Sequence, residues 1–135
     1  MTEIENHAVK RIRAEFFKSQ AGNEPVREEL LKLGRPIKTV VGEDILFIEQ
    51  NWPLDRPYVD LLKRGRGRAE ASIYEARHTV EKVEFRTLFF VHEERMVLTH
   101  FIRKKQRKTP PDAIELAYKR MKLWMTEQIR LEKKK

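Results

Sequence analysis

The chain has 135 residues, of which 40% are hydrophobic and 37% are charged, and it contains no cysteine. This length suits one domain, and the composition indicates a globular protein with a heavily charged surface. The apolar runs are far too short for a membrane span, and residues 1–6 have none of the features of a secretory signal, so we expect a cytoplasmic protein. The absence of cysteine excludes disulfides, a thiolate nucleophile and a Cys-based zinc site.

The positive charge is concentrated at the C-terminal end. Residues 1–102 carry 17 Lys and Arg against 17 Asp and Glu, whereas residues 103–135 carry 12 against 4, which is the whole net charge of +8. Such a distribution favours a phosphate-rich partner, because clustered Lys and Arg release counterions when they neutralise a nucleic acid backbone. Residues 133–135 alone would be a solvated tail. Residues 103–108 directly follow a strand-like segment, so we expect the fold to hold this basic run in place.

In chain order, the first predicted elements are a strand and two helices. Residues 9–17 alternate imperfectly between apolar and charged side chains and predict a short strand, although an amphipathic helix would also fit. Asn23 is placed to cap a helix that ends at Gly34. A second helix is predicted over about residues 36–51, and the short turn between the two helices should make them an antiparallel hairpin.

The second half of the chain predicts three strands and a last helix. Residues 63–68 contain four basic residues and two glycines, which predicts an exposed loop. Segments rich in aromatic and β-branched residues then predict an antiparallel meander joined by hairpin-length links. Thr109 is placed to cap the final helix, with Pro110 at its first position. The three strands are predicted over residues 72–79, 83–92 and 96–103.

These elements predict an α+β fold with the order β-α-α-β-β-β-α. The helical hairpin would pack on one face of a small twisted antiparallel sheet and leave the other face at least partly open. We find no internal repeat and no domain boundary, so residues 1–135 should form a single domain. Its basic C-terminal helix and tail would span residues 110–135.

Strand alternation brings a set of charged side chains to one region of the predicted sheet. Arg86 lies in mid-strand, where a packing residue would be expected. In one interpretation it pairs with Glu75 or Glu84 on a solvated surface. In the other interpretation it helps to surround one phosphate. The residues that adjacent strands would contribute to such a site are Glu75, Arg77, Arg86, His100, Lys104 and Lys105.

A set of this kind could cleave RNA without a metal ion. A base removes the proton of a ribose 2′-OH, the oxygen attacks the neighbouring phosphorus, cations stabilise the charge, and an acid protonates the leaving 5′ oxygen. Glu75 and His100 are the titratable groups available, whereas His78 should point to the other side of the sheet. The histidines lack ligand spacing, and Gly65 and Gly67 do not belong to a phosphate-loop motif, so we expect no metal and no cofactor.

Several segments taken together resemble the RelE/HigB-like toxins of type II toxin–antitoxin modules, in particular their phage-derived branch. The aromatic-Glu-x-Arg motif at residues 74–77, the strand led by Arg86, and the basic Lys104-Lys105 turn before the last helix carry much of the similarity. The combination is fairly specific, and it extends over roughly residues 12–125. Further matching blocks are residues 14–17, 21–27, 37–54 and 96–100.

The resemblance implies a RelE-like fold and a toxin that cleaves mRNA on the ribosome without a metal ion. It also implies a cognate antitoxin, often a helix-turn-helix protein, which would join the monomeric or dimeric toxin in a hetero-oligomer. By position, Glu75, Arg77 and Arg86 match the family's strand residues and His100 matches a histidine frequent in this branch, so these four are the candidate catalytic residues. The candidate RNA-binding residues are Arg103, Lys104, Lys105, Arg107, Lys108, Arg66 and Arg68.

The sequence leaves two other functions open. Relatives of the ParE type poison DNA gyrase on the same scaffold, and a basic RNA-binding module would bind RNA without cutting it.

Two departures from the family pattern also bear on the site. Phe101 and Ile102 differ from the usual residues of the branch, which alters the expected local shape. The loop at residues 63–71 is longer and more basic than the family's turn, and it would be either an additional RNA contact or a simple insertion.

Overall fold

Five strands and three helices make up the described part of the chain, residues 9–134, in the computed structural model. Residues 1–8, on which the expectation of no secretory signal depends, and Lys135 at the end of the predicted basic tail lie outside the described residues. The elements are β1 (Arg13–Phe16), α2 (Pro25–Leu33), α3 (Ile37–Asn51), β2 (Val59–Lys63), β3 (Ile73–Val80), β4 (Val83–His92), β5 (Arg95–Arg103) and α4 (Pro111–Lys133).

The strands form one mixed sheet in the order β1-β5-β4-β3-β2. The α+β class and its small RelE-like arrangement are confirmed, but the sheet is not wholly antiparallel, because β1 runs parallel to β5. Strand β2, which local sequence patterns do not predict, pairs antiparallel with β3 at the opposite edge. Its sequence, Val-Asp-Leu-Leu-Lys, lacks the clear alternation of apolar and polar residues that would have identified it.

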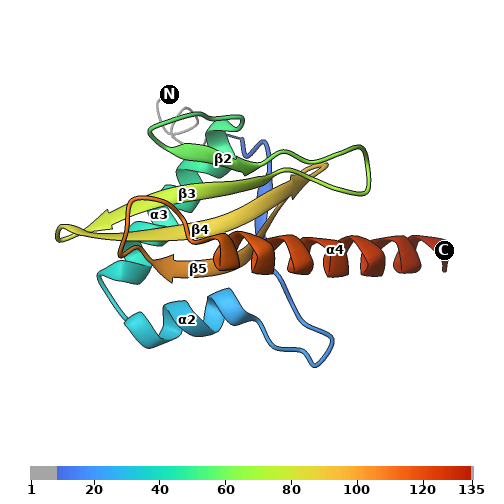
Figure 1. Cartoon of the computed structure of the whole chain (residues 1–135), viewed down its shortest axis with the longest axis horizontal. Coiled ribbons are helices and arrows are strands. Elements are labelled where there is room, and N and C mark those ends of the chain that lie inside the picture. The colour runs from blue at the N-terminus through green and yellow to red at the C-terminus, as the bar shows by residue number, and fades with distance from the viewer. Residues whose placement is uncertain (1–8, 135) are drawn as a thin grey trace.

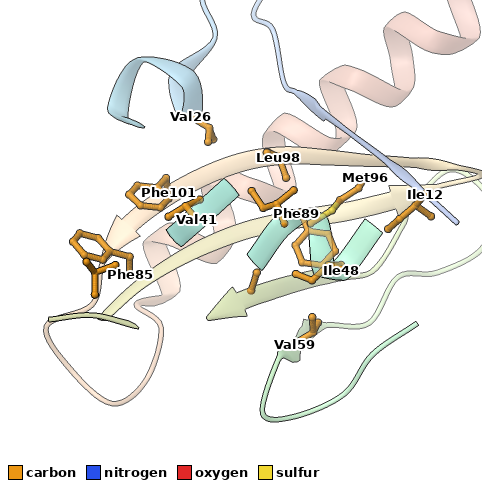
Figure 2. Packing of buried hydrophobic residues seen from close by; sticks show 13 residues of the cluster. Ile12, Val26, Val41, Ile48, Val59, Phe85, Phe89, Met96, Leu98 and Phe101 are labelled. Atoms are coloured by element: carbon orange, nitrogen blue, oxygen red, sulfur yellow. The ribbon is translucent and has the colours of Figure 1, made fainter. Parts of the chain in front are cut away.

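Both faces of the sheet are covered by helices (Figure 1). Helices α2 and α3 pack on one face, where Val26, Val41 and Ile48 meet Phe89 and Leu98 (Figure 2). The expectation that the other face stays partly open is wrong. Helix α4 covers it with a regular apolar stripe, because positions spaced three or four apart in a helix share one side. The second core consists of Ala113, Ala117, Met121, Trp124 and Met125 of α4 together with Phe17, Ile73, Leu88, Phe90 and Val97.

The helix starts differ slightly from the predicted caps. Helix α2 begins after Glu24, and no side chain caps it, so Asn23 is not the N-cap. Helix α4 begins after Pro110, again without a side-chain cap. The hydroxyl of Thr109 instead donates a hydrogen bond to Glu75, which ties the start of α4 to β3. Gly34 ends α2 with a φ of 68°, as expected from its freedom to adopt a positive φ.

His78 points to the α3 side of the sheet, as strand alternation predicts. Its Nδ1 lies 2.8 Å from an Asp44 carboxylate oxygen, and its Nε2 lies 2.7 Å from the Thr87 hydroxyl. The imidazole is buried, with only 1% of the residue exposed. A buried polar group of this kind is stable only when both nitrogens have partners, so His78 fixes α3 against β3 and β4.

The turn between β3 and β4 consists of Glu81 and Lys82, which both have positive φ values, 51° and 70°. Two-residue hairpins favour this conformation, because its twist matches that of the flanking strands. The turn lies at one end of the sheet, beside the chain that leaves β5, whereas the β2–β3 loop lies at the opposite end (Figure 1). No helix between residues 9 and 134 is long and apolar enough to cross a membrane.

Candidate nucleic-acid interface

A groove of about 920 Å³ lies where the β3–β4 hairpin meets the chain that leaves β5. The backbone N–H of Lys104 donates a 2.8 Å hydrogen bond to the carbonyl of Glu84, which continues the pairing of β4 and β5 beyond the last strand residue. The fold thereby holds the start of the basic run, at Lys104, in place beside β4. The residues that line this basic groove are Arg77, Lys82, Val83, Glu84, Arg86, Arg103, Lys104, Lys105, Gln106 and Arg107.

Most of the predicted charged residues meet in the basic groove. Seven of its ten lining residues are Lys or Arg, and Lys82 had not been predicted from the sequence. The salt bridges found among residues 9–134 involve none of the five cations contributed by the turn and by residues 103–107. These five are therefore free to neutralise phosphates. The predicted residues that reach the groove are Arg77, Arg86, Arg103, Lys104, Lys105 and Arg107.

Arg86 and Glu75 form a buried ion pair beneath the groove instead of an exposed site. Arg86 Nε lies 3.1 Å from Glu75 Oε1, and the two residues are only 3% and 1% exposed. Arg86 also binds Glu84 at 2.6 Å, so it pairs with both carboxylates that strand alternation offered. The hydroxyl of Thr109 donates to the second oxygen of Glu75. Because Glu75 is almost wholly buried and both of its oxygens are bonded within the protein, it cannot contact a substrate in this conformation.

Glu84 is a carboxylate that lines the groove, although its sequence position predicts only a salt bridge with Arg86. Its side chain is half exposed. A hydrogen bond and the positive charge from Arg86 hold the pKa of the Glu84 carboxyl below its ordinary value; burial opposes this shift, and Lys104 and Arg77 reinforce it. Glu84 is therefore ionised at neutral pH. Its position two residues before Arg86 on one strand face was the signal that could have identified it.

Arg77 lies at the rim of the groove and is held by a second carboxylate. It is the cross-strand neighbour of Arg86. One of its guanidinium nitrogens lies 2.5 Å from an Asp60 oxygen, and Arg56 binds the other oxygen of Asp60. Each of the two neighbouring arginines thus has its own acidic partner, which offsets their mutual repulsion. About a third of the Arg77 side chain is exposed.

His100 does not line the groove. A register irregularity between β4 and β5 leaves Thr99 without a cross-strand partner and places His100 opposite Leu88. Strict alternation would have put His100 on the same side as Met96, but this bulge moves it to the α4 side. Burial lowers the pKa of His100, the charge of Arg120 lowers it further, and Glu29 partly opposes the shift. His100 is thus a half-buried, neutral imidazole between α2 and α4.

The remaining predicted RNA contacts lie elsewhere. Arg66 and Arg68 are exposed in the β2–β3 loop, at the other end of the sheet from the groove (Figure 1). Lys108 is exposed in the segment before α4 but does not line the groove. Within the described residues, no group of three or more His, Cys, Asp or Glu is arranged to hold a metal ion.

The sequence of the chain is similar to that of a known protein family. The family described as "Phage derived protein Gp49-like (DUF891)" matches the chain over residues 28–122. The matched segment covers more than two thirds of the chain. It begins in α2 and ends in α4, so it includes the whole basic groove. A search of curated proteins gives no match.

Proposed function

Because the chain belongs to the Gp49-like family of phage-derived proteins, which is associated with the toxins of toxin–antitoxin modules, we propose that it is the toxin of such a module. Its activity would be that of an endoribonuclease of the RelE/HigB type, which cleaves mRNA on the ribosome. The family also suggests an antitoxin as a partner. We propose that this antitoxin is a helix-turn-helix protein and that the toxin acts in the cytoplasm, where ribosomes and mRNA are found.

The observation that carries this proposal is the basic groove. Five cations that form no salt bridge within residues 9–134 converge there on a hollow that opens to solvent, and they come from the β3–β4 turn and from residues 103–107. Such a set can bind a phosphate backbone and stabilise the charge that develops at phosphorus when a ribose 2′-oxygen attacks it. Lys104 and Lys105 lie at the centre of the basic segment, so we assign the main phosphate contacts to them.

The structure changes the roles that we propose for the predicted catalytic residues. Arg86 holds the carboxylate of Glu84 from below, and Glu75 in turn holds Arg86, so both act as positioning residues. Glu84 is ionised and half exposed in the groove, and it is therefore our candidate for the group that accepts the 2′-OH proton. Arg77 and the lysines would stabilise the phosphate, and water in the open groove would protonate the leaving 5′ oxygen. His100 lies between α2 and α4, so we give it no role in catalysis.

The proposal predicts that removal of two charges from the groove abolishes toxicity. Expression of the wild type should arrest growth, and co-expression of the antitoxin should rescue it. Lys104→Gln combined with Lys105→Gln should lower RNA cleavage by translating ribosomes about 100-fold or more, because each positioned cation stabilises the transition state by several kcal/mol. The matched control is Lys119→Gln with Lys133→Gln, which removes the same charge from exposed positions of α4.

Thermal unfolding of each variant provides the check on folding. The proposal requires the control pair to remain toxic and the groove pair to become harmless while both stay folded. Equal toxicity of the two variants, or toxicity without any cut RNA, would contradict it.

A further inference from the structure

A second, smaller pocket opens on the α3 side of the sheet edge, next to the basic groove. Its volume is about 240 Å³, below the range of roughly 300–1,000 Å³ that is typical of pockets for drug-sized ligands. It therefore has room for a single small ring system rather than for a larger ligand. The residues that line this aromatic pocket are Asp44, Phe47, Ile48, Tyr58 and Arg77.

Two aromatic rings on the surface distinguish this pocket. Phe47 is 40% exposed and Tyr58 is 49% exposed, although large aromatic side chains are normally among the more buried residues. Their ring centroids lie 4.9 Å apart at an angle of 41°. The rings come from different elements, since Phe47 belongs to α3 and Tyr58 immediately precedes β2. Exposed rings arranged in this way offer a face on which a planar group can stack.

Arg77 connects the aromatic pocket to the basic groove, because it lines both. Its ion pair with Asp60 fixes the guanidinium at the boundary between the two. Asp44 also lines the pocket, where one carboxylate oxygen is bound by the buried His78 and the side chain remains 39% exposed. The pocket thus combines a stacking surface, a cation and a hydrogen-bond acceptor beside the basic groove.

We propose that the aromatic pocket holds one nucleobase of the RNA strand whose phosphates lie in the basic groove. The base stacks on Tyr58 and Phe47, Arg77 contacts the strand on the phosphate side, and Asp44 accepts a hydrogen bond from an amino or imino group of the base. This inference rests on the proposed function, because it requires a nucleic acid in the groove. Recognition by stacking tolerates different bases, since every base presents a π-face.

The test uses single-stranded oligonucleotides without 2′-OH groups, which cannot be cleaved, and the intact protein at low salt. Each oligonucleotide carries 2-aminopurine, a fluorescent base that is quenched on stacking, at one of several successive positions. In the wild type, binding should quench one position more than its neighbours. Tyr58→Leu should restore the fluorescence of that position in the saturated complex and weaken binding about 5- to 100-fold. Tyr58→Phe keeps the ring and should behave as the wild type.

The outcomes separate the pocket from the groove. Lys104→Gln with Lys105→Gln should weaken binding of every oligonucleotide and flatten its salt dependence, without selective recovery of fluorescence at the quenched position. If the strand binds through the groove but no position is selectively quenched, or if Tyr58→Leu leaves the quenching unchanged, the pocket is not a base site and the groove assignment stands. If the wild type binds no strand at low salt, both assignments are overturned.

Discussion

Arg86 lies in a buried network of charges, so its substitution should affect folding before it affects activity. The guanidinium binds Glu75 below and Glu84 at the groove, and both Arg86 and Glu75 are almost wholly buried. Burying a charge is tolerated only when its partner is present. Removal of Arg86 alone would leave the Glu75 carboxylate buried, with the Thr109 hydroxyl as its remaining partner.

We therefore expect Arg86→Ala to lower the free energy of unfolding by about 3–5 kcal/mol, the usual cost of breaking a buried ion pair. Urea unfolding followed by circular dichroism measures this difference. The matched variant combines Arg86→Met with Glu75→Leu and thus removes both charges. Its free energy of unfolding should fall by less than half of the decrease expected for Arg86→Ala. If Arg86→Ala unfolds at the same urea concentration as the wild type, the Arg86–Glu75 ion pair does not stabilise the fold.

His100 should make the fold sensitive to mild acid. Burial and the charge of Arg120 lower its pKa below the ordinary value of 6.5, so the unfolded chain takes up the proton first as the pH falls. Stability from this group is therefore complete above about pH 6.5 and is lost progressively below it. The wild type should lose more free energy of unfolding between pH 7.5 and pH 5 than a His100→Asn variant, which has no group to protonate. Equal losses would show that His100 is not shielded in this way.

At the level of the elements, local sequence patterns predict a helix or strand well where apolar residues recur at a regular spacing over a long segment. The predicted second helix differs from α3 by one residue at its start, and β4 was predicted with its observed bounds. The first strand was predicted too long, because β1 is stabilised mainly by its parallel pairing with β5. The bulge at Thr99 was not visible either, since alternation assumes a regular strand.

The candidate site was predictable only in part, because some of its contacts join residues of separate elements. Residues 103–107 are adjacent in the sequence, so their charge run and the preceding strand were sufficient to place them together. The role of Glu84 depends on cross-strand contacts, and the aromatic pocket joins Phe47 to Tyr58 across two elements. The burial of Glu75 depends on where α4 packs. An amphipathic stripe shows that a helix is covered, but it does not show which face of the sheet it covers.

Considered as a whole, the molecule gathers five cations from separate segments at one end of the sheet. The fold brings the Lys82 turn and residues 103–107 to that end, whereas Arg66 and Arg68 lie at the other. A cluster of one sign at a groove attracts polyanions and orients them as they approach. This arrangement explains how a small chain could engage a phosphate backbone with few residues.

The most direct test of the central claim is to map RNA ends on ribosomes shortly after expression begins. The account predicts new 5′-hydroxyl ends within coding sequences for the wild type and for the Lys119→Gln, Lys133→Gln control, and none above background for Lys104→Gln with Lys105→Gln. Intact mRNA together with growth arrest by the wild type would contradict it. Damaged DNA in those cells would then indicate a gyrase poison, and salt-sensitive binding of uncut RNA would indicate a simple RNA-binding module.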